Sequence, residues 1–261
     1  MNRSRVRVIV QKEWLDLRKN KMVLVMLFAL PILMVVMILG TAWVMARAPG
    51  GQGQSNGLAL PAPLMGLHPQ DGLMVLINDQ FMFYLFMVPI ALPVYIAAYS
   101  IIGEKETRSL EPILATPIST AELLLGKIIA AVTPTVIAAW ISFAFTAAGM
   151  YLITNPVVFS FLVRPVWSVG MLLHSPLFGL LSASCGVIAS SRLNDPRAAQ
   201  QVTALIVLPI IGVSVAVIMG RIYMDSRVLI WATLAAILIN VVVLWLTVKL
   251  FQRETILTRW K

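Results

Sequence analysis

The chain has few charged residues, one cysteine and two histidines. Charged side chains make up 12% of its 261 residues, about half the share found in soluble domains. The single cysteine, Cys185, excludes an internal disulfide, and no cysteine–histidine spacing typical of a zinc site is present. Because Cys185 lies inside an apolar run, we expect it to be a small buried apolar residue. The composition therefore argues against a disulfide-stapled or metal-binding domain.

Catalytic motifs are also missing from the sequence. There is no HExxH motif and no cluster of carboxylates, and His174 and its neighbour Ser175 point in different directions on a helix. The one Gly-Lys pair, Gly126-Lys127, is followed by isoleucine, whereas a phosphate-binding loop continues with serine or threonine. We therefore expect no catalytic residue, no metal and no cofactor in this chain.

Long apolar runs dominate the sequence, whose mean hydropathy is +0.89. Six runs are long enough to cross about 30 Å of hydrocarbon as helices. They are expected at 22–46, 81–102, 123–153, 169–190, 202–220 and 228–251. The first is about twice as long as the 7–15 apolar residues of a secretory signal, so we expect it to be retained. The third is longer than needed and is expected to tilt or to end early. The sequence predicts an all-α polytopic membrane protein with a single transmembrane domain over 1–261.

Basic residues fall mainly on one side of these spans. Sixteen of the 20 lysines and arginines lie near the two termini or in the segments 103–127 and 191–201. The other side receives Arg47, Arg164, Arg221 and Arg227. Because cytoplasmic segments carry the excess of basic residues, both termini and both segments are expected in the cytoplasm. The net charge of +9 fits anionic lipid headgroups, and the basic face that would bind nucleic acid is absent.

Before the first span, apolar residues recur at three- and four-residue spacing. They are Val6, Val10, Trp14 and Leu17. Most charged residues, Lys12 and Glu13 among them, lie off this stripe. The spacing predicts an amphipathic helix over 1–21 that lies in the membrane interface, with Trp14 at headgroup depth. The alternative is a basic flank that only fixes the topology.

A charged insert separates the second and third spans. Its first part carries Glu104, Lys105, Glu106, Arg108 and Glu111, which interleave with Leu110, Ile113 and Leu114. This pattern is typical of a short helix with one apolar and one charged face. We expect the whole segment 103–122 to lie in water, where a partner can contact it. Ser119 and Glu122 have the spacing of a capping box, which predicts the start of the third span.

The insert resembles the first cytoplasmic loop of ABC-2-type permeases, the membrane subunits of ATP-binding-cassette exporters. The resemblance rests on Glu104-Lys105-Glu106, Leu110-Glu111, Thr116-Pro117-Ile118-Ser119, Glu122-Leu123-Leu124 and Gly126-Lys127. It extends more weakly to the opening Lys12-Glu13 and to the segment from Ser191 to Pro209. The family usually has a small residue, often glycine, where this chain has Arg108.

This resemblance implies a six-helix permease subunit in the cell membrane of a prokaryote. It would pair with a second permease chain, identical or closely related, and sit on two ATPase subunits that bind ATP and magnesium. The segment 103–122 would be the coupling helix that docks into a groove of the ATPase. The residues implied for this contact are Glu104, Glu106, Arg108, Leu110, Glu111, Ile113 and Leu114.

The translocation path is implied at the dimer interface, along the second and fifth spans. Candidate polar contacts are Tyr95, Tyr99, Ser100 and Thr203, with Tyr84 and Ser214 as further positions, and ordinary helix packing would explain each of them equally well. The substrate stays open. Two other functions also stay open: an ion-gradient-driven transporter, although the spans hold almost no ionisable residue near their centres, and a non-transporting scaffold, in which the charged insert has no role.

Overall fold

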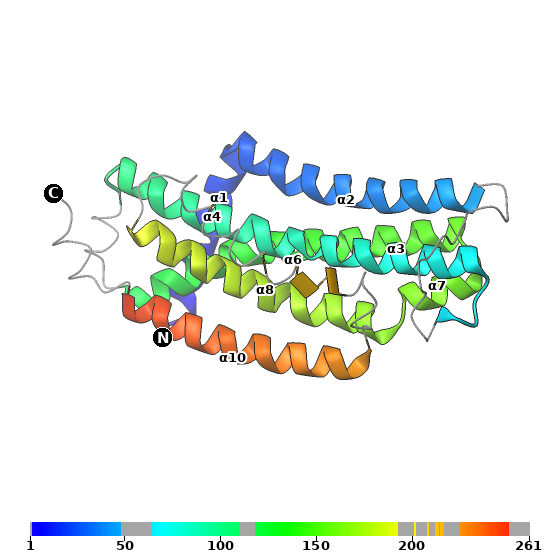
Figure 1. Cartoon of the computed structure of the whole chain (residues 1–261). Helices are drawn as coiled ribbons and strands as arrows, with labels where there is room; N and C mark the ends of the chain where they lie inside the picture. Colours follow the sequence, from blue (N-terminus) through cyan, green and yellow to red (C-terminus); the bar gives the residue numbers. More distant parts are fainter. Residues whose placement is uncertain are drawn as a thin grey trace.

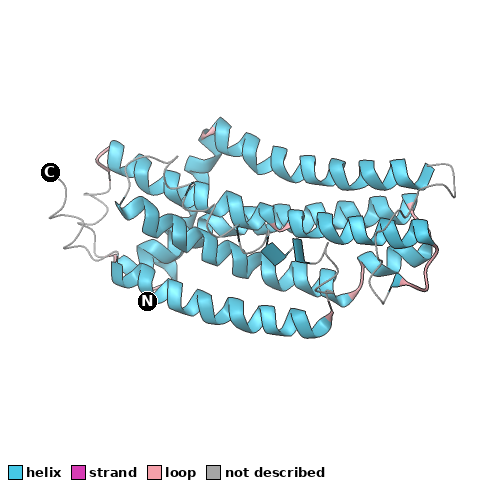
Figure 2. Cartoon of the chain, in the orientation of Figure 1, coloured by secondary structure: helices cyan, strands magenta, loops and turns pink. Residues whose placement is uncertain are grey.

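The computed structural model describes residues 2–47, 64–109, 118–192 and 225–250, together with a few single positions between 201 and 216. Within these ranges the chain forms helices joined by short turns and contains no strand (Figure 2). The helices are α1 (Arg3–Lys19), α2 (Lys21–Arg47), α3 (Pro69–Leu85), α4 (Met87–Glu106), α6 (Thr120–Ile153), α7 (Pro156–Leu162), α8 (Pro165–Arg192) and α10 (Ser226–Leu250).

Five stretches of the described chain are long and apolar enough to cross a membrane. They are Lys21–Arg47, Pro69–Glu106, Thr120–Ile153, Pro156–Ser191 and Ser226–Leu250. The span expected at 202–220 falls almost entirely outside the described residues. An all-helical chain with several spans is therefore confirmed, and the sixth span stays a prediction.

The helices differ from the sequence expectation at the start of the second span, whereas the third span ends at the expected residue, Ile153. The helical stretch that contains the expected span 81–102 begins earlier, at Pro69, and is interrupted at Phe86. The start of this stretch was not predicted because Asn78 and Asp79 are polar residues, which usually lie in exposed loops. In the structure both are buried inside the bundle. The third span does not end early, since α6 runs for 34 residues.

The capping box at the start of α6 is confirmed. The backbone N–H of Glu122 donates to Ser119 Oγ at 3.2 Å, and the Glu122 carboxylate accepts from the Ser119 N–H at 3.0 Å. The two residues thus satisfy each other's backbone donors at a helix end.

Helix α4 packs against both α6 and α8, which also contact each other, and α2 packs on α6 while α10 packs on α8 (Figure 1). Its inward residues, Ile90, Ile101 and Ile102 among them, are almost completely buried. The outer helices expose large apolar side chains instead, such as Phe28 of α2 and Trp231 of α10. This arrangement suits a bundle whose outer faces contact lipid or another apolar surface.

Helix α1 runs across one end of the bundle, from the start of the chain to the start of α2 (Figure 1). Asn2 caps it, because Asn2 Oδ1 accepts the backbone N–H of Ser4 at 3.1 Å. It packs against α6, where Ile9 lies directly over Gly126. A Cβ atom at Gly126 would lie 2.6 Å from Ile9 Cγ2 and 2.8 Å from Ile9 Cβ. A side chain larger than hydrogen at position 126 would thus push α1 away from α6.

The substitution Gly126→Ala is expected to lower the thermal denaturation temperature of the protein in detergent. Overpacking a close contact of this kind costs about 1–3 kcal/mol, and the Cβ of Ile9 cannot rotate out of the way. Gly40→Ala is the matched control, because Gly40 is also helical and a Cβ atom there would have no neighbouring atom within 4 Å. Equal denaturation temperatures for Gly126→Ala and the unchanged protein would contradict the close packing of α1 on α6.

Candidate functional site

The expected contact segment 103–122 begins inside α4 and ends inside α6, at the end of the bundle that α1 crosses. We call this the α1 end. Glu106 and Arg108 are exposed there. Leu110, Glu111, Ile113 and Leu114 lie outside the described residues. The structure therefore places the two ends of the segment beside each other and beside α1.

Glu104 was expected to lie in water with the rest of the segment. In the structure it is buried and only 6% exposed. Its carboxylate pairs with the ammonium groups of Lys12 from α1 and Lys127 from α6, the latter at 2.8 Å. Helix α4 continues through Glu106, so that Glu104 is on a helical turn that faces α1 and α6. The expectation that the whole insert is solvated is thus wrong at this position.

Glu13 of α1 is also buried, although the pattern placed it on the polar face of an interfacial helix. It is 5% exposed, and its carboxylate accepts from Lys127 Nζ at 2.8 Å and from Ser100 Oγ at 2.6 Å. Burial by itself raises the pKa of Glu13, but the charge and hydrogen bond of Lys127, the hydrogen bond from Ser100 and the charge of Lys12 together lower that pKa below its ordinary value. Glu13 is therefore ionised at neutral pH, and protonation at acidic pH would weaken this contact.

Lys127 is the residue that sequence reasoning missed. It lies two turns into α6 with a side chain that is 1% exposed. From the sequence it was expected to be a cytoplasmic basic residue and part of a Gly-Lys pair that does not bind phosphate, and no buried ion pair was predicted for it. A signal was present, because a lysine inside an apolar helical run needs a buried carboxylate partner. The sequence did not show that its partners come from α1 and α4.

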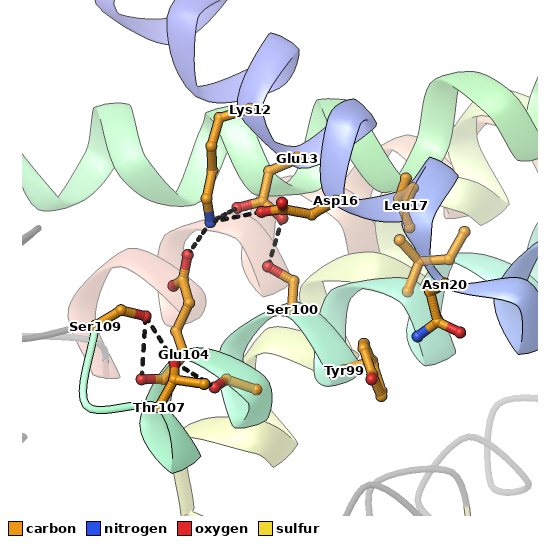
Figure 3. A pocket seen from close by; sticks show the side chains of 12 residues that line it. Lys12, Glu13, Asp16, Leu17, Asn20, Tyr99, Ser100, Glu104, Thr107 and Ser109 are labelled. Atoms are coloured by element: carbon orange, nitrogen blue, oxygen red, sulfur yellow. Dashed lines mark hydrogen bonds and ion pairs between the residues drawn. The ribbon is translucent and has the colours of Figure 1, made fainter.

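An open cavity of about 290 Å³ lies between α1 and α4. Figure 3 shows the Lys12 ammonium pointing toward the carboxylates of Glu13, Asp16 and Glu104. Burial by itself disfavours the charged ammonium, but the hydrogen bond to Glu104 and the charge of Glu13 raise the pKa of Lys12. The cavity wall is therefore an ion-pair network of mixed sign rather than a basic or acidic patch.

The translocation candidates of α4 lie near this cavity. Tyr99 and Ser100 line it, and the Tyr95 and Tyr99 rings stack with centroids 6.1 Å apart. The Tyr95 hydroxyl lies 3.4 Å from the sulfur of Met22, and Ser100 belongs to the ion-pair network. Tyr84 lies farther along, at the end of α3, and Thr203 and Ser214 are outside the described residues.

The predicted stripe of α1 lies partly against the bundle. Val6, Val10 and Leu17 are partly buried, while Trp14 is 39% exposed and donates its ring N–H to the carbonyl of Ala130 at 3.2 Å. The opposite side of α1 exposes Val8 and Leu15. Helix α1 thus offers apolar groups on both sides, one to α6 and one to its surroundings.

A second buried ion pair lies away from the α1 end. The guanidinium of Arg164, just before α8, pairs with Asp79 of α3. Asp79 also accepts from the ring N–H of Trp167 at 2.8 Å. Asp79 lies before the span expected at 81–102, so this pair was not predicted from the sequence. Among the described residues there is no group of three or more His, Cys, Asp or Glu side chains that would hold a metal ion.

Arg108 adopts a backbone conformation that favours glycine. Its φ is 54°, in the left-handed region where a Cβ atom is unfavourable. The Arg108 N–H donates to the carbonyl of Lys105 at 3.1 Å, and the Ser109 N–H donates to that of Glu104 at 3.0 Å. These two bonds make a Schellman motif that ends α4. The glycine usual in the resembled family at this position has the same physical role.

Replacing Arg108 by glycine is expected to stabilise the chain by up to about 1 kcal/mol. The energy that a residue with a Cβ atom loses in the left-handed conformation exceeds the entropy that glycine adds to the unfolded chain. Thermal denaturation of the purified chain measures the change. Thr107→Gly is the control, since Thr107 has φ −82° and glycine there relieves no strain. It adds entropy to the unfolded chain and removes the hydrogen bond from Thr107 Oγ1 to the carbonyl of Gly103, so this variant is expected to lose stability. A loss of stability in Arg108→Gly equal to that in Thr107→Gly would refute the strained turn.

Comparison with known proteins assigns the family. The family model described as ABC-2 family transporter protein matches residues 7–230, which include α2 through α8 and the first turn of α10. No curated protein matches the chain. The family model covers most of the chain, and the matched segment holds at least four apolar helical stretches that are long enough to cross a membrane. The chain is therefore a multi-pass membrane protein that belongs to the ABC-2 transporter family.

Proposed function

We propose that this chain is the permease subunit of an ABC exporter and that it couples to a separate ATPase through the segment 103–122. Family membership implies an ABC permease that works with an ABC ATPase. The observation that carries the finer proposal is the α1 end, where α4 ends, α6 begins and α1 crosses. A partner that binds the segment between α4 and α6 would act on three helices at once.

The energy for transport would come from another polypeptide. The one Gly-Lys pair is built into α6, where Gly126 packs under Ile9 and the Lys127 ammonium is occupied by Glu13 and Glu104. Neither residue is available to hold a phosphate, which requires free backbone amides and a free lysine. In the proposed complex, two ATPase subunits bind ATP and magnesium, and this chain binds neither.

The contact surface for the ATPase is narrower than the sequence suggested. Glu104 is enclosed by Lys12 and Lys127 and is not available to a partner. The acidic groups left for the rim of the contact are Glu106 and Glu111, with Arg108 beside them. The apolar face expected from Leu110, Ile113 and Leu114 would fill the groove of the ATPase, because apolar anchors within a charged rim are typical of specific interfaces.

A second permease chain, identical or closely related, would complete the path through the membrane. The apolar outer faces of α2 and α10 provide surface for that chain and for lipid. The bias of basic residues supports a cytoplasmic location for both termini and for the segment 103–122. The direction of transport follows from the resemblance to exporters.

Topology reporters fused at residue 57 and at Lys261 are expected to signal an outside and a cytoplasmic location, respectively. The reason is the positive-inside bias, with 16 of 20 basic residues on one side. Paired reporters that are active on opposite sides, such as alkaline phosphatase and green fluorescent protein, measure this directly. An outside signal at Lys261 would contradict either the six spans or their orientation.

The variants Glu111→Lys and Leu114→Asp are expected to release the ATPase and abolish ATP-dependent transport. Glu111→Lys would set a positive charge against the basic groups expected to face Glu111 at the rim, and like charges juxtaposed across an interface cost several kcal/mol. Leu114→Asp would place a carboxylate without a partner in an apolar groove. Co-purification of an ATPase encoded next to this chain measures the loss. Membrane insertion should survive, because both residues lie outside the apolar spans.

Met65→Asp is the matched control for Leu114→Asp. Met65 is 69% exposed and lies between the first two spans, outside the segment 103–122, so its variant should keep the ATPase. Retention of the ATPase and of full transport by Glu111→Lys and Leu114→Asp would overturn the coupling role. Transport that persists without the ATPase and stops when ion gradients are dissipated would favour a secondary transporter instead.

A further inference from the structure

The Lys127 side chain joins three elements of the α1 end. Its Nζ lies 2.8 Å from Glu13 Oε1 of α1 and 2.6 Å from Ser100 Oγ of α4. It also approaches Glu104 Oε2 of α4 to 2.8 Å, as an ion pair without an aligned hydrogen bond. Because the side chain is 1% exposed, water cannot replace any of these partners.

The same end of α1 is attached to α6 at further points. The Glu122 carboxylate accepts the backbone N–H of Asn2 at 2.6 Å and lies 3.6 Å from the guanidinium of Arg5. The ring N–H of Trp14 donates to the carbonyl of Ala130. Going along α1 from Asn2 to Trp14, the partners on α6 advance from Glu122 to Ala130. The buried ion pair therefore lies within a continuous line of contact between α1 and the start of α6.

The position of this contact along the chain matters for coupling. Glu104 lies two residues before the end of α4, and Lys127 lies seven residues after the start of α6. Glu104 and Lys127 thus close the base of the segment 107–119, which joins the two helices. A displacement of that segment that moves the end of α4 relative to the start of α6 would break the contact between Glu104 and Lys127.

We propose that Lys127 is a positioning residue for coupling, which locks α1, α4 and α6 into one rigid body at the base of the segment 107–119. Apolar helix contacts can slide over one another, whereas a desolvated ion pair with several hydrogen bonds has one favourable geometry. A push on the segment then moves α1, and with it the start of α2, together with α4 and α6. This inference rests on the proposed coupling to an ATPase.

The test uses a charge-balanced variant, Glu13→Gln/Lys127→Met. Lys127→Met alone would leave two buried carboxylates with one ammonium and would strongly lower the yield of folded protein. The double variant removes one positive and one negative charge, so the remaining Lys12–Glu104 pair stays matched and the chain is expected to fold. It should still bind the ATPase, because the segment 103–122 keeps its exposed groups.

Spin labels at positions 15 and 145 report on the lock. Leu15 and Phe145 are exposed. Trp14, next to Leu15, contacts Ala130 of α6, and Phe145 lies farther along α6. A rise of 1.5 Å per residue from Ala130 to Phe145 then puts the labels on the order of 20 Å apart. The single native cysteine, Cys185, is replaced by serine, and labelled chain is diluted with unlabelled chain. The distance between the two labels is measured by pulsed electron paramagnetic resonance on the permease–ATPase complex. It is measured without nucleotide and with ADP trapped by vanadate.

With Lys127 present, we expect one narrow distance that is the same in both nucleotide states. In Glu13→Gln/Lys127→Met, we expect the distance to broaden without nucleotide and to shift by several ångströms on trapping. The control is Asp79→Asn/Arg164→Met, which removes the buried ion pair between α3 and α8 and should keep the narrow distance.

Three results would overturn the proposal. They are a narrow, unchanged distance in Glu13→Gln/Lys127→Met, an equal broadening in the control variant, and a distance in the unchanged complex that shifts when nucleotide is trapped. If no ATPase co-purifies with the unchanged chain, the proposed function fails instead. The lock is then decided on the permease alone: broadening in the double variant but not in the control supports it, and any other pattern refutes it.

Discussion

The α1 end depends on one physical constraint, the need of a buried ammonium group for partners that the protein itself supplies. Lys127 is enclosed in the bundle, and an isolated charge there would be far more costly than the loss of any apolar contact. Its carboxylates come from two other elements, α1 and α4, so that the charge can be neutralised only when three helices assemble in one arrangement. The surface ion pair of Lys12 with Asp16 adds little by comparison, because Asp16 is half exposed. The same requirement fixes Ser100, which donates to Glu13 and accepts from Lys127.

Polar contacts and close packing have a particular weight in this fold. Apolar burial drives helices together only weakly in a membrane, because lipid chains are as apolar as leucine. Register is then set by the points at which backbones approach closely and by hydrogen bonds. Gly126 against Ile9 is one such point, and Gly186 is another, because a Cβ there would lie 2.8 Å from the carbonyl of Val94. The Asp79–Arg164 pair with Trp167 has the corresponding role between α3 and α8. The apolar side chains in the middle of the bundle fill the space between the helices. These few polar and close contacts determine how the helices are positioned against one another.

Five spans could be predicted from the sequence, although one of them begins earlier than expected. Hydrocarbon thickness sets the length of a span, and a run of apolar residues shows that length directly. The capping box at Ser119 and Glu122 was equally readable, since it is local to one helix turn. Glu13, Asp79 and Glu104 were misplaced for one shared reason. A charged residue in an otherwise apolar pattern is assigned to water unless its partner is known. Glu13 and Asp79 have partners 114 and 85 positions away in the sequence. Glu104 pairs with Lys12, 92 positions away, and with Lys127 on the next long helix. Pattern analysis has no access to such distances, so the helices were predictable and the ion pairs between them were not.

The burial of Glu104 also changes how the charged insert is understood. As a sequence, Glu104, Glu106, Arg108 and Glu111 form one uniform charged run. In the structure the run divides within one helical turn: Glu104 faces α1 and α6, and Glu106 and Arg108 face away from the bundle. The strained turn at Arg108 ends α4 directly beyond this division. A single short segment can thus hold its inner charge in the fold while its outer charges stay free for a partner. The buried charge and the exposed charges lie within a few residues of each other at the end of α4. A contact made with the exposed charges would therefore act on the buried ion pair of Glu104.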